Sequence, residues 1–328
     1  MSEAYDSNRV NLSNDMHVCL DIRRVDFRAF EKPVVTLGSF DGVHRGHQTI
    51  IRRLIEKSQD KKRTGVVVTY EPHPQSVVSP HDAPGLLTTL EEKLFLFERL
   101  EVEEVVVMNF DEELKDYSAE EFVERILVGK FDLGSLVVGD DHAFGKRRSG
   151  GITLLRQMSS EYNFDLDTVP ALLVNGSRVS SSRIRRELET GEFAQVTSWL
   201  GHGYPITGRV IRGKGRGKIL GYPTLNLEVP SGKLLPQDGV YSVKARLDQG
   251  EYLGMMYVGP KPTFGDEDRS VEVHLFGLEG DAGGMKVALS VEGWIRAPIS
   301  FPDAESLRIQ LRSDETKVKQ LFRIHCSY

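Results

Sequence analysis

The stretch VVTLGSFDGVHRGH, residues 34–47, decides the fold of the first half of the chain. It starts as a short apolar run, passes through a glycine-rich turn and reaches two histidines, His44 and His47. A buried strand that leads through such a turn into a helix directs backbone N–H groups and a helix N-terminus at one point, which suits a polyphosphate. On a first helical turn, residues three apart point to the same side, so we expect both imidazoles to face that point.

From this stretch to about residue 171, short apolar runs alternate with segments of helical spacing. Apolar runs predict buried strands at 34–37, 66–70, 105–108 and 136–139. Between them, apolar residues recur at helical spacing, as at Ile51, Leu54 and Ile55 and then at Leu94 and Phe97. Strands that alternate with helices in this way predict a parallel sheet covered by helices on both sides.

After about His202 the pattern changes to short β-type runs separated by Gly, Pro and Asp. We expect strands at 204–211, 224–229, 240–247, 252–258, 271–276 and 285–295, and a helix at 303–322. The sequence thus predicts an α/β fold class: a Rossmann-like parallel-sheet domain, then an antiparallel β-barrel domain with a C-terminal helix. We place the domains at 17–192 and 200–324.

Composition limits the classes of function. A length of 328 residues exceeds what one core usually serves, and 27% charged residues with a net charge of -6 give no general attraction to nucleic acid. Two cysteines, Cys19 and Cys326, exclude a disulfide framework and a four-thiolate metal site. The polar first 16 residues lack the apolar core of a signal peptide, and no apolar stretch is long enough for a membrane span. We expect a cytoplasmic protein, a monomer or weak homo-oligomer, whose partners are small molecules.

The histidine pair also has plainer interpretations. Two surface or helix-capping histidines would produce the same spacing. A zinc site is less favoured, because the metalloprotease helix spaces its histidines four apart with a Glu between them. The loops at 69–74 and 138–148 and the serines at 180–182 would, taken alone, be ordinary solvated loops and a helix N-cap.

In combination, these segments resemble a known family. The runs GSFDGVHRGH, EPHP, VVGDDHAFG and SSSRIRREL occur in the order of the prokaryotic FAD synthetase module, an H-x-G-H nucleotidyltransferase. The resemblance implies that His44 and His47 are catalytic and contact the ATP phosphates. It implies ATP binding by Gly38, Ser39, Phe40, Asp41, Gly42, Gly46, Ser180, Ser181 and Arg183, and flavin binding by Glu71, Pro72, His73, Pro74, Asp141 and Phe144.

A second motif follows in the predicted barrel, where residues 208–226 read GRVIRGKGRGKILGYPTLN. Glycines interleaved with cations suit phosphates, although a flexible basic hairpin would look similar. The spacing differs from that of a Walker A loop, because Ile219 follows Lys218 where Ser or Thr is needed. Thr224 and Asn226 point the same way on a strand and offer hard oxygen ligands for the magnesium ion of Mg-ATP.

This segment resembles the riboflavin kinase signature. The resemblance implies Mg²⁺ binding by Thr224 and Asn226, and proton abstraction from the riboflavin 5′-hydroxyl by the catalytic carboxylate Glu272. It implies ATP binding by Gly213, Gly215, Arg216, Gly217, Gly221 and Pro223.

The leading expectation is therefore a bifunctional enzyme. Its barrel would phosphorylate riboflavin to FMN, and its N-terminal domain would adenylylate FMN to FAD with release of pyrophosphate, both with Mg-ATP. Two alternatives stay open: one retained activity, or an inactive flavin-binding regulator. The departure from the family pattern at His142-Ala143 motivates the first alternative, and Ser182 and Glu71 depart from the pattern as well. The intact His44, His47, Thr224, Asn226 and Glu272 argue against the second.

Overall fold

The computed structural model describes residues 9–11, 16–20, 30–213, 217, 220–261, 266–280 and 282–325. The chain forms two compact units, one made of Met1–Leu86 and Lys93–Ser180, the other of Leu87–Glu92 and Ser181–Tyr328. The predicted domain limits of 17–192 and 200–324 concern functional domains rather than packing units, and they stay predictions.

The first unit is built on a sheet of seven strands in the order β1-β2-β5-β4-β3-β6-β7. The strands are β1 (Arg9–Asn11), β2 (His17–Cys19), β3 (Val34–Leu37), β4 (Gly65–Glu71), β5 (Glu104–Asn109), β6 (Ser135–Gly139) and β7 (Asp165–Val169). All pairs are parallel except β1 with β2. The four apolar runs are confirmed as central strands. The sequence prediction missed β1, β2 and β7; β7 reads DLDTV and is half-exposed over most of its length, so it lacks an apolar run.

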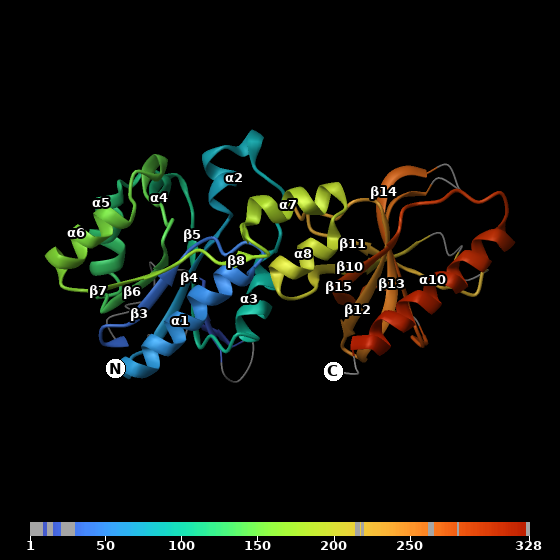
Figure 1. The fold of residues 1–328 in the computed structure, drawn as a ribbon, viewed down its shortest axis with the longest axis horizontal. Coiled ribbons are helices and arrows are strands. Elements are labelled where there is room, and N and C mark those ends of the chain that lie inside the picture. The colour runs from blue at the N-terminus through green and yellow to red at the C-terminus, as the bar shows by residue number, and fades with distance from the viewer. Residues whose placement is uncertain are drawn as a thin grey trace. The chain divides into compact units, whose positions relative to one another are not determined.

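Helices cover both faces of this sheet, as predicted (Figure 1). Helix α1 (Arg45–Lys61) buries Ile51 and Leu54 and contacts β3, β4, β6 and β7. The other face, which includes Val35 and Leu37, packs against α5 (Ala119–Phe122), the π-helical segment η5 (Val123–Val128) and α6 (Ile152–Tyr162). The unit also contains α2 (Pro74–Val78), η4 (Pro80–Asp82), most of α3 (Leu90–Glu98), α4 (Glu112–Asp116), η6 (Lys146–Arg148) and the hairpin β8 (Leu173–Val174) and β9 (Ser177–Arg178).

The strand order reverses direction at β3. From β3 the chain proceeds to β4 and β5 on one side, and it returns to place β6 and β7 on the other side. Loops at the carboxyl ends of strands on either side of such a reversal form the usual ligand crevice of open α/β sheets. The loops that follow β3, β4 and β6 meet at this edge.

The second unit is a closed antiparallel barrel in the order β10-β11-β14-β13-β12-β15. Its strands are β10 (Tyr204–Ile211), β11 (Leu225–Glu228), β12 (Gly239–Leu247), β13 (Gly250–Lys261), β14 (Asp266–Leu275) and β15 (Lys286–Arg296). Helix α10 (Ala304–His325) lies against the barrel (Figure 1) and packs Val318 and Phe322 on Val240 and Met255. The predicted six strands and C-terminal helix are confirmed.

Two further helices, α7 (Ser181–Thr190) and α8 (Phe193–Leu200), pack on each other in the second unit. Within the described residues, no helix combines the length and apolar character that a membrane span requires.

Candidate functional site

The predicted histidine pair lies at the start of α1, immediately after the turn that follows β3. His44 is the N-cap, and its Nδ1 accepts a hydrogen bond of 3.3 Å from the His47 backbone N–H. Because Nδ1 is the acceptor, a neutral His44 carries its proton on Nε2. The cap therefore places the N–H donor of the neutral ring on the side opposite Nδ1.

The two imidazole rings stack, with centroids 3.6 Å apart and an angle of 15° between the planes. Burial lowers the pKa of His47 well below 6.5, and the neighbouring charges of His44 and Lys93 lower it further. Among the described residues, the buried Nδ1 of His47 has no hydrogen-bond partner. The lowered pKa keeps the His47 imidazole neutral, and its Nδ1 lies beside a helix N-terminus, which is a suitable place for phosphoryl oxygens.

The turn before the helix has an unusual backbone. Gly42 has a φ of 83°, and the non-glycine residues Phe40 and Val43 also have positive φ angles, 47° and 39°. Such conformations persist where the surrounding structure holds them. A Cβ on Gly46 would lie 3.2 Å from Cε1 of His44, so glycine keeps room for that ring.

Lys93 on α3 is a residue of this site that the sequence reasoning missed. Its side chain is buried, and its Nζ donates a hydrogen bond of 3.1 Å to Thr69 Oγ1 on β4. Burial lowers the pKa of Lys93, while the charges of Asp41 and Glu71 raise it. Lys93 lies one helical turn before the buried Phe97, and this spacing was the signal available in the sequence.

The predicted flavin-binding turn begins where β4 ends. Burial raises the pKa of Glu71, while the charge of Lys93 lowers it and that of Asp41 raises it. His73 caps α2, because its Nδ1 accepts a hydrogen bond of 3.2 Å from the Gln75 backbone. Pro72 and Pro74 flank it, Pro72 after a cis peptide bond and Pro74 as the first residue of α2.

In the loop after β6, the two predicted flavin-binding residues, Asp141 and Phe144, are engaged in contacts within the protein. Asp141 forms an ion pair with Arg178 of β9. Phe144 belongs to the core, 9% exposed and against Phe122 with ring centroids 5.7 Å apart. Its core position limits the part of its ring that a flavin can reach. Flavin binding by both residues stays a prediction.

The serine segment falls at the limit between the two units. Ser180 ends the first unit, whereas Ser181 and Arg183 belong to α7 in the second. Their assignment to ATP binding stays a prediction.

The second predicted site lies at one end of β11 and β14 in the barrel. Thr224 Oγ1 donates a hydrogen bond of 3.2 Å to Glu272 Oε2, and Asn226 is the pairing partner of Glu272 across the two strands. The three predicted residues are therefore brought together. Because Thr224 gives its proton to Glu272, its oxygen lone pairs point elsewhere and remain suitable for a cation.

The glycines before this strand leave room for its side chains. A Cβ on Gly213 would lie 2.0 Å from Asn226 Nδ2, and one on Gly217 would lie 2.3 Å from the Tyr222 carbonyl oxygen. Gly221 has a φ of 79°, and the exposed Pro223 offers its carbonyl to His274 Nδ1 at 2.7 Å. Gly215 and Arg216 lie outside the described residues.

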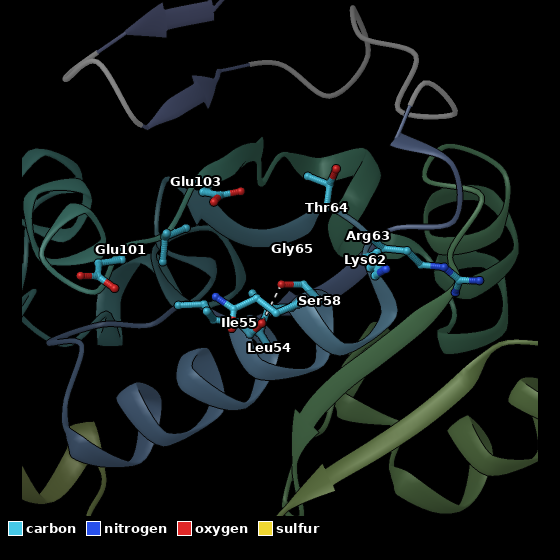
Figure 2. Close-up of a pocket in the computed structure, with 11 residues that line it drawn as sticks. Leu54, Ile55, Ser58, Lys62, Arg63, Thr64, Gly65, Glu101 and Glu103 are labelled. Atoms are coloured by element: carbon cyan, nitrogen blue, oxygen red, sulfur yellow. Dashed lines mark hydrogen bonds between the residues drawn. The ribbon is translucent and has the colours of Figure 1, made fainter.

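A pocket of about 370 Å³ lies elsewhere in the first unit. Figure 2 shows Lys62 and Arg63 on one side of it and Glu101 and Glu103 on the other. It adjoins the amino end of β4, where Gly65 begins the strand, so it occupies the opposite edge of the sheet from the histidine pair. This pocket is separate from the predicted chemistry.

Comparisons with known proteins match both halves of the chain. The family model described as FAD synthetase matches residues 27–183, and the model described as riboflavin kinase matches residues 200–322. The chain is 32% identical to the bifunctional riboflavin kinase/FMN adenylyltransferase of Haemophilus influenzae, over 90% of this chain and 96% of that protein. The enzyme of the same description from Escherichia coli K12 is 32% identical over 88% of this chain and 92% of its own length.

Among solved structures, a Streptococcus pneumoniae protein described as a macrolide-efflux protein is similar throughout. It has a TM-score of 0.79 and 26% identity, and the match covers 92% of this chain and 98% of that one.

Proposed function

The chain belongs to the family of bifunctional riboflavin kinases/FMN adenylyltransferases, and from this premise we propose which residues carry each reaction. The enzyme phosphorylates riboflavin to FMN with ATP and then adenylylates FMN to FAD. The alternatives raised by the departures from the family pattern, one retained activity or none, are outcomes of the experiment below.

Adenylyl transfer is assigned to the N-terminal sheet, with His44 and His47 as its catalytic residues. The stacked imidazoles at the N-terminus of α1 carry this assignment. Attack of the FMN phosphate on the α-phosphorus of ATP builds negative charge on the phosphoryl oxygens, and N–H donors fixed beside them stabilise it. The Nε2–H of His44 and the backbone N–H groups of the first helical turn are such donors.

ATP is assigned to the loop from Gly38 to Gly46, with closure by Ser180, Ser181 and Arg183. The flavin is assigned to the turn from Glu71 to Pro74 and to Asp141 and Phe144 after β6. The support is that the loops after β3, β4 and β6 share one edge of the sheet at the reversal of strand order.

Phosphorylation of riboflavin is assigned to the barrel, with Glu272 as the general base. Its carboxylate would accept the proton of the riboflavin 5′-hydroxyl as the oxygen attacks the γ-phosphate. The hydrogen bond from Thr224 holds one carboxylate oxygen in place. The glycine loop at Gly213, Gly215, Arg216, Gly217, Gly221 and Pro223 would bind the ATP phosphates.

The residues present fit a magnesium ion. Thr224 Oγ1 and the Asn226 side-chain oxygen are hard donors, and the missing Cβ of Gly213 makes room for Asn226. When bound, Mg²⁺ neutralises phosphate charge. We further assign the enzyme to the cytoplasm, as a monomer or weak homo-oligomer.

Chromatography of the flavins formed from riboflavin, ATP and Mg²⁺ tests the assignment. Wild type should yield FAD, His47→Ala should stop at FMN, and Glu272→Ala should make no FMN from riboflavin yet still convert supplied FMN to FAD. Each loss should be roughly 10²- to 10⁴-fold. FMN as the final product of wild type would indicate one retained activity, and unchanged riboflavin would indicate a binding protein. FAD formation by both variants would refute the residue assignment.

A further inference from the structure

Lys93 is a buried cation next to the histidine pair, and the two assigned reactions give it no role. Its side chain is 4% exposed, on the face of α3 that also carries Phe97. A lysine is rarely buried without partners, because removing an ammonium from water is costly. Its partners therefore indicate what it does.

Thr69, the first partner of Lys93, connects it to the ATP loop by hydrogen bonds. Lys93 Nζ donates to Thr69 Oγ1 at 3.1 Å, and Thr69 Oγ1 donates to the Ser39 carbonyl oxygen at 3.2 Å. Thr69 is fully buried. This chain of hydrogen bonds fixes the backbone one residue before Phe40, where φ is positive and the loop needs outside support.

Charge links Lys93 to both predicted substrate segments. Asp41, in the ATP loop, is 1% exposed, and Glu71 ends the strand before the predicted flavin turn. Both carboxylates stabilise the ammonium form of Lys93, and Lys93 in turn favours the charged form of Glu71. One cation thus compensates a carboxylate from each segment.

The same helix also supports the loop through its aromatic face. The Phe97 ring meets Phe40 edge-on with centroids 5.7 Å apart, and Phe40 meets His47 edge-on at 5.3 Å. Lys93 and Phe97 are one helical turn apart, so α3 holds the loop at two points.

We propose that Lys93 is a positioning residue for adenylyl transfer, which holds the ATP loop through Thr69 and Asp41 and sets the loop against the flavin turn through Glu71. This inference rests on the proposed adenylyl-transfer site at His44 and His47. Lys93 acts through these groups, whereas the histidines meet the substrate.

The test compares Lys93→Met with the pair Thr69→Val and Thr69→Ser in the full chain. Initial rates of FMN adenylylation are measured against ATP and FMN, and riboflavin phosphorylation in the same samples reports whether the protein is intact. We expect Lys93→Met to lower kcat/KM for adenylylation roughly 10- to 100-fold while the kinase rate stays within about twofold. Thr69→Val should also lower kcat/KM for adenylylation. Thr69→Ser keeps the hydroxyl and should therefore keep kcat/KM near the wild-type value.

The pH profile separates positioning from a general packing defect. The groups that act on His47 and Lys93 are His44, Asp41 and Glu71. Removal of the Lys93 charge raises the pKa of both His47 and Glu71, so each takes up a proton at higher pH. The acid limb of the adenylylation profile should therefore move to higher pH in Lys93→Met. It should stay in place in Lys61→Met, which removes an exposed lysine paired with Asp165.

Wild-type adenylylation and an unshifted profile in Lys93→Met would overturn the proposal. If Lys93→Met does not fold, the threonine pair decides, and equal rates for Thr69→Val and Thr69→Ser would refute the link. The variant His47→Ala distinguishes failure of the proposed adenylyl-transfer site from failure of the role proposed for Lys93. Its full activity would refute the adenylyl-transfer site itself, whereas an inactive His47→Ala with a normal Lys93→Met refutes only the role of Lys93.

Discussion

Lys233 Nζ donates a hydrogen bond of 2.8 Å to Glu92 Oε2, and the two side chains are 0% and 1% exposed. The other carboxylate oxygen of Glu92 accepts the Thr207 backbone N–H at 2.6 Å. The ammonium group also donates to the Leu87 carbonyl and lies 4.2 Å from the centroid of the Tyr204 ring. The second unit thus contains a fully buried ion pair whose remaining polar atoms are hydrogen-bonded, the condition under which such a pair is tolerated.

The first prediction concerns this pair. Lys233→Met leaves the Glu92 carboxylate buried without a counter-charge, so it should lower the free energy of unfolding of the second unit by about 3–5 kcal/mol. Adding Glu92→Gln removes that charge and should recover part of the loss. Urea unfolding followed by tryptophan fluorescence measures this, because Trp199 and Trp294 both lie in the second unit. A double variant as unstable as the sum of the single variants would contradict the pairing.

The second prediction uses the space at Gly213. In Gly213→Ala the new Cβ meets Asn226 Nδ2 at 2.0 Å, and the end of a side chain can move aside at little cost to folding. We therefore expect an unchanged melting temperature and a kinase rate lower by roughly 10- to 100-fold. Gly151→Ala is the control, since its added Cβ lies 4.0 Å from the His142 carbonyl oxygen. Equal kinase rates in both variants would show that the position of Asn226 is unimportant.

The third prediction concerns metal dependence. Chelation of Mg²⁺ should stop both reactions, because we propose that both use Mg-ATP. Asn226→Ala removes one of the two proposed oxygen ligands, so the kinase should need roughly 10- to 100-fold more Mg²⁺ for its half-maximal rate. Adenylylation should keep its wild-type requirement. Initial rates of both reactions against free Mg²⁺ in one preparation measure this, and an unchanged kinase curve would exclude Asn226 as a ligand.

Much of the architecture was predictable because apolar runs mark central strands. The strands β3, β4, β5 and β6 are buried on both faces, and each contains at least two consecutive valines. Strand β7 was missed because it is half-exposed and carries two aspartates. The reversal of strand order at β3 depends on long-range pairing, which the sequence pattern does not encode locally.

The sites were predictable to the extent that motifs are contiguous. The pair His44 and His47 was found because its spacing is local. Glu272 was reached only through the family resemblance, and its hydrogen bond with Thr224, 48 residues away in the sequence, was not predicted. Lys93 has no motif. Its place beside the site follows from the packing of α3, and a charged residue in an amphipathic helix normally indicates the solvated face.

The last prediction concerns the pH dependence of stability through His142. Burial lowers its pKa to about 4, and among the described residues its buried Nε2 has no hydrogen-bond partner. In the unfolded chain its pKa is about 6.5, so between these values the unfolded state binds a proton that the folded state does not. Stability of the first unit should therefore fall as the pH decreases from about 6.5 to 4, by about 3 kcal/mol from this residue. His47, whose pKa is also lowered, adds in the same direction.

His142→Phe should reduce this acid sensitivity, and His81→Gln at an exposed position should not. Hydrogen exchange of the β6 amides, corrected for intrinsic rates, measures this stability at each pH. If stability falls equally with pH in both variants, the acid sensitivity belongs to other groups.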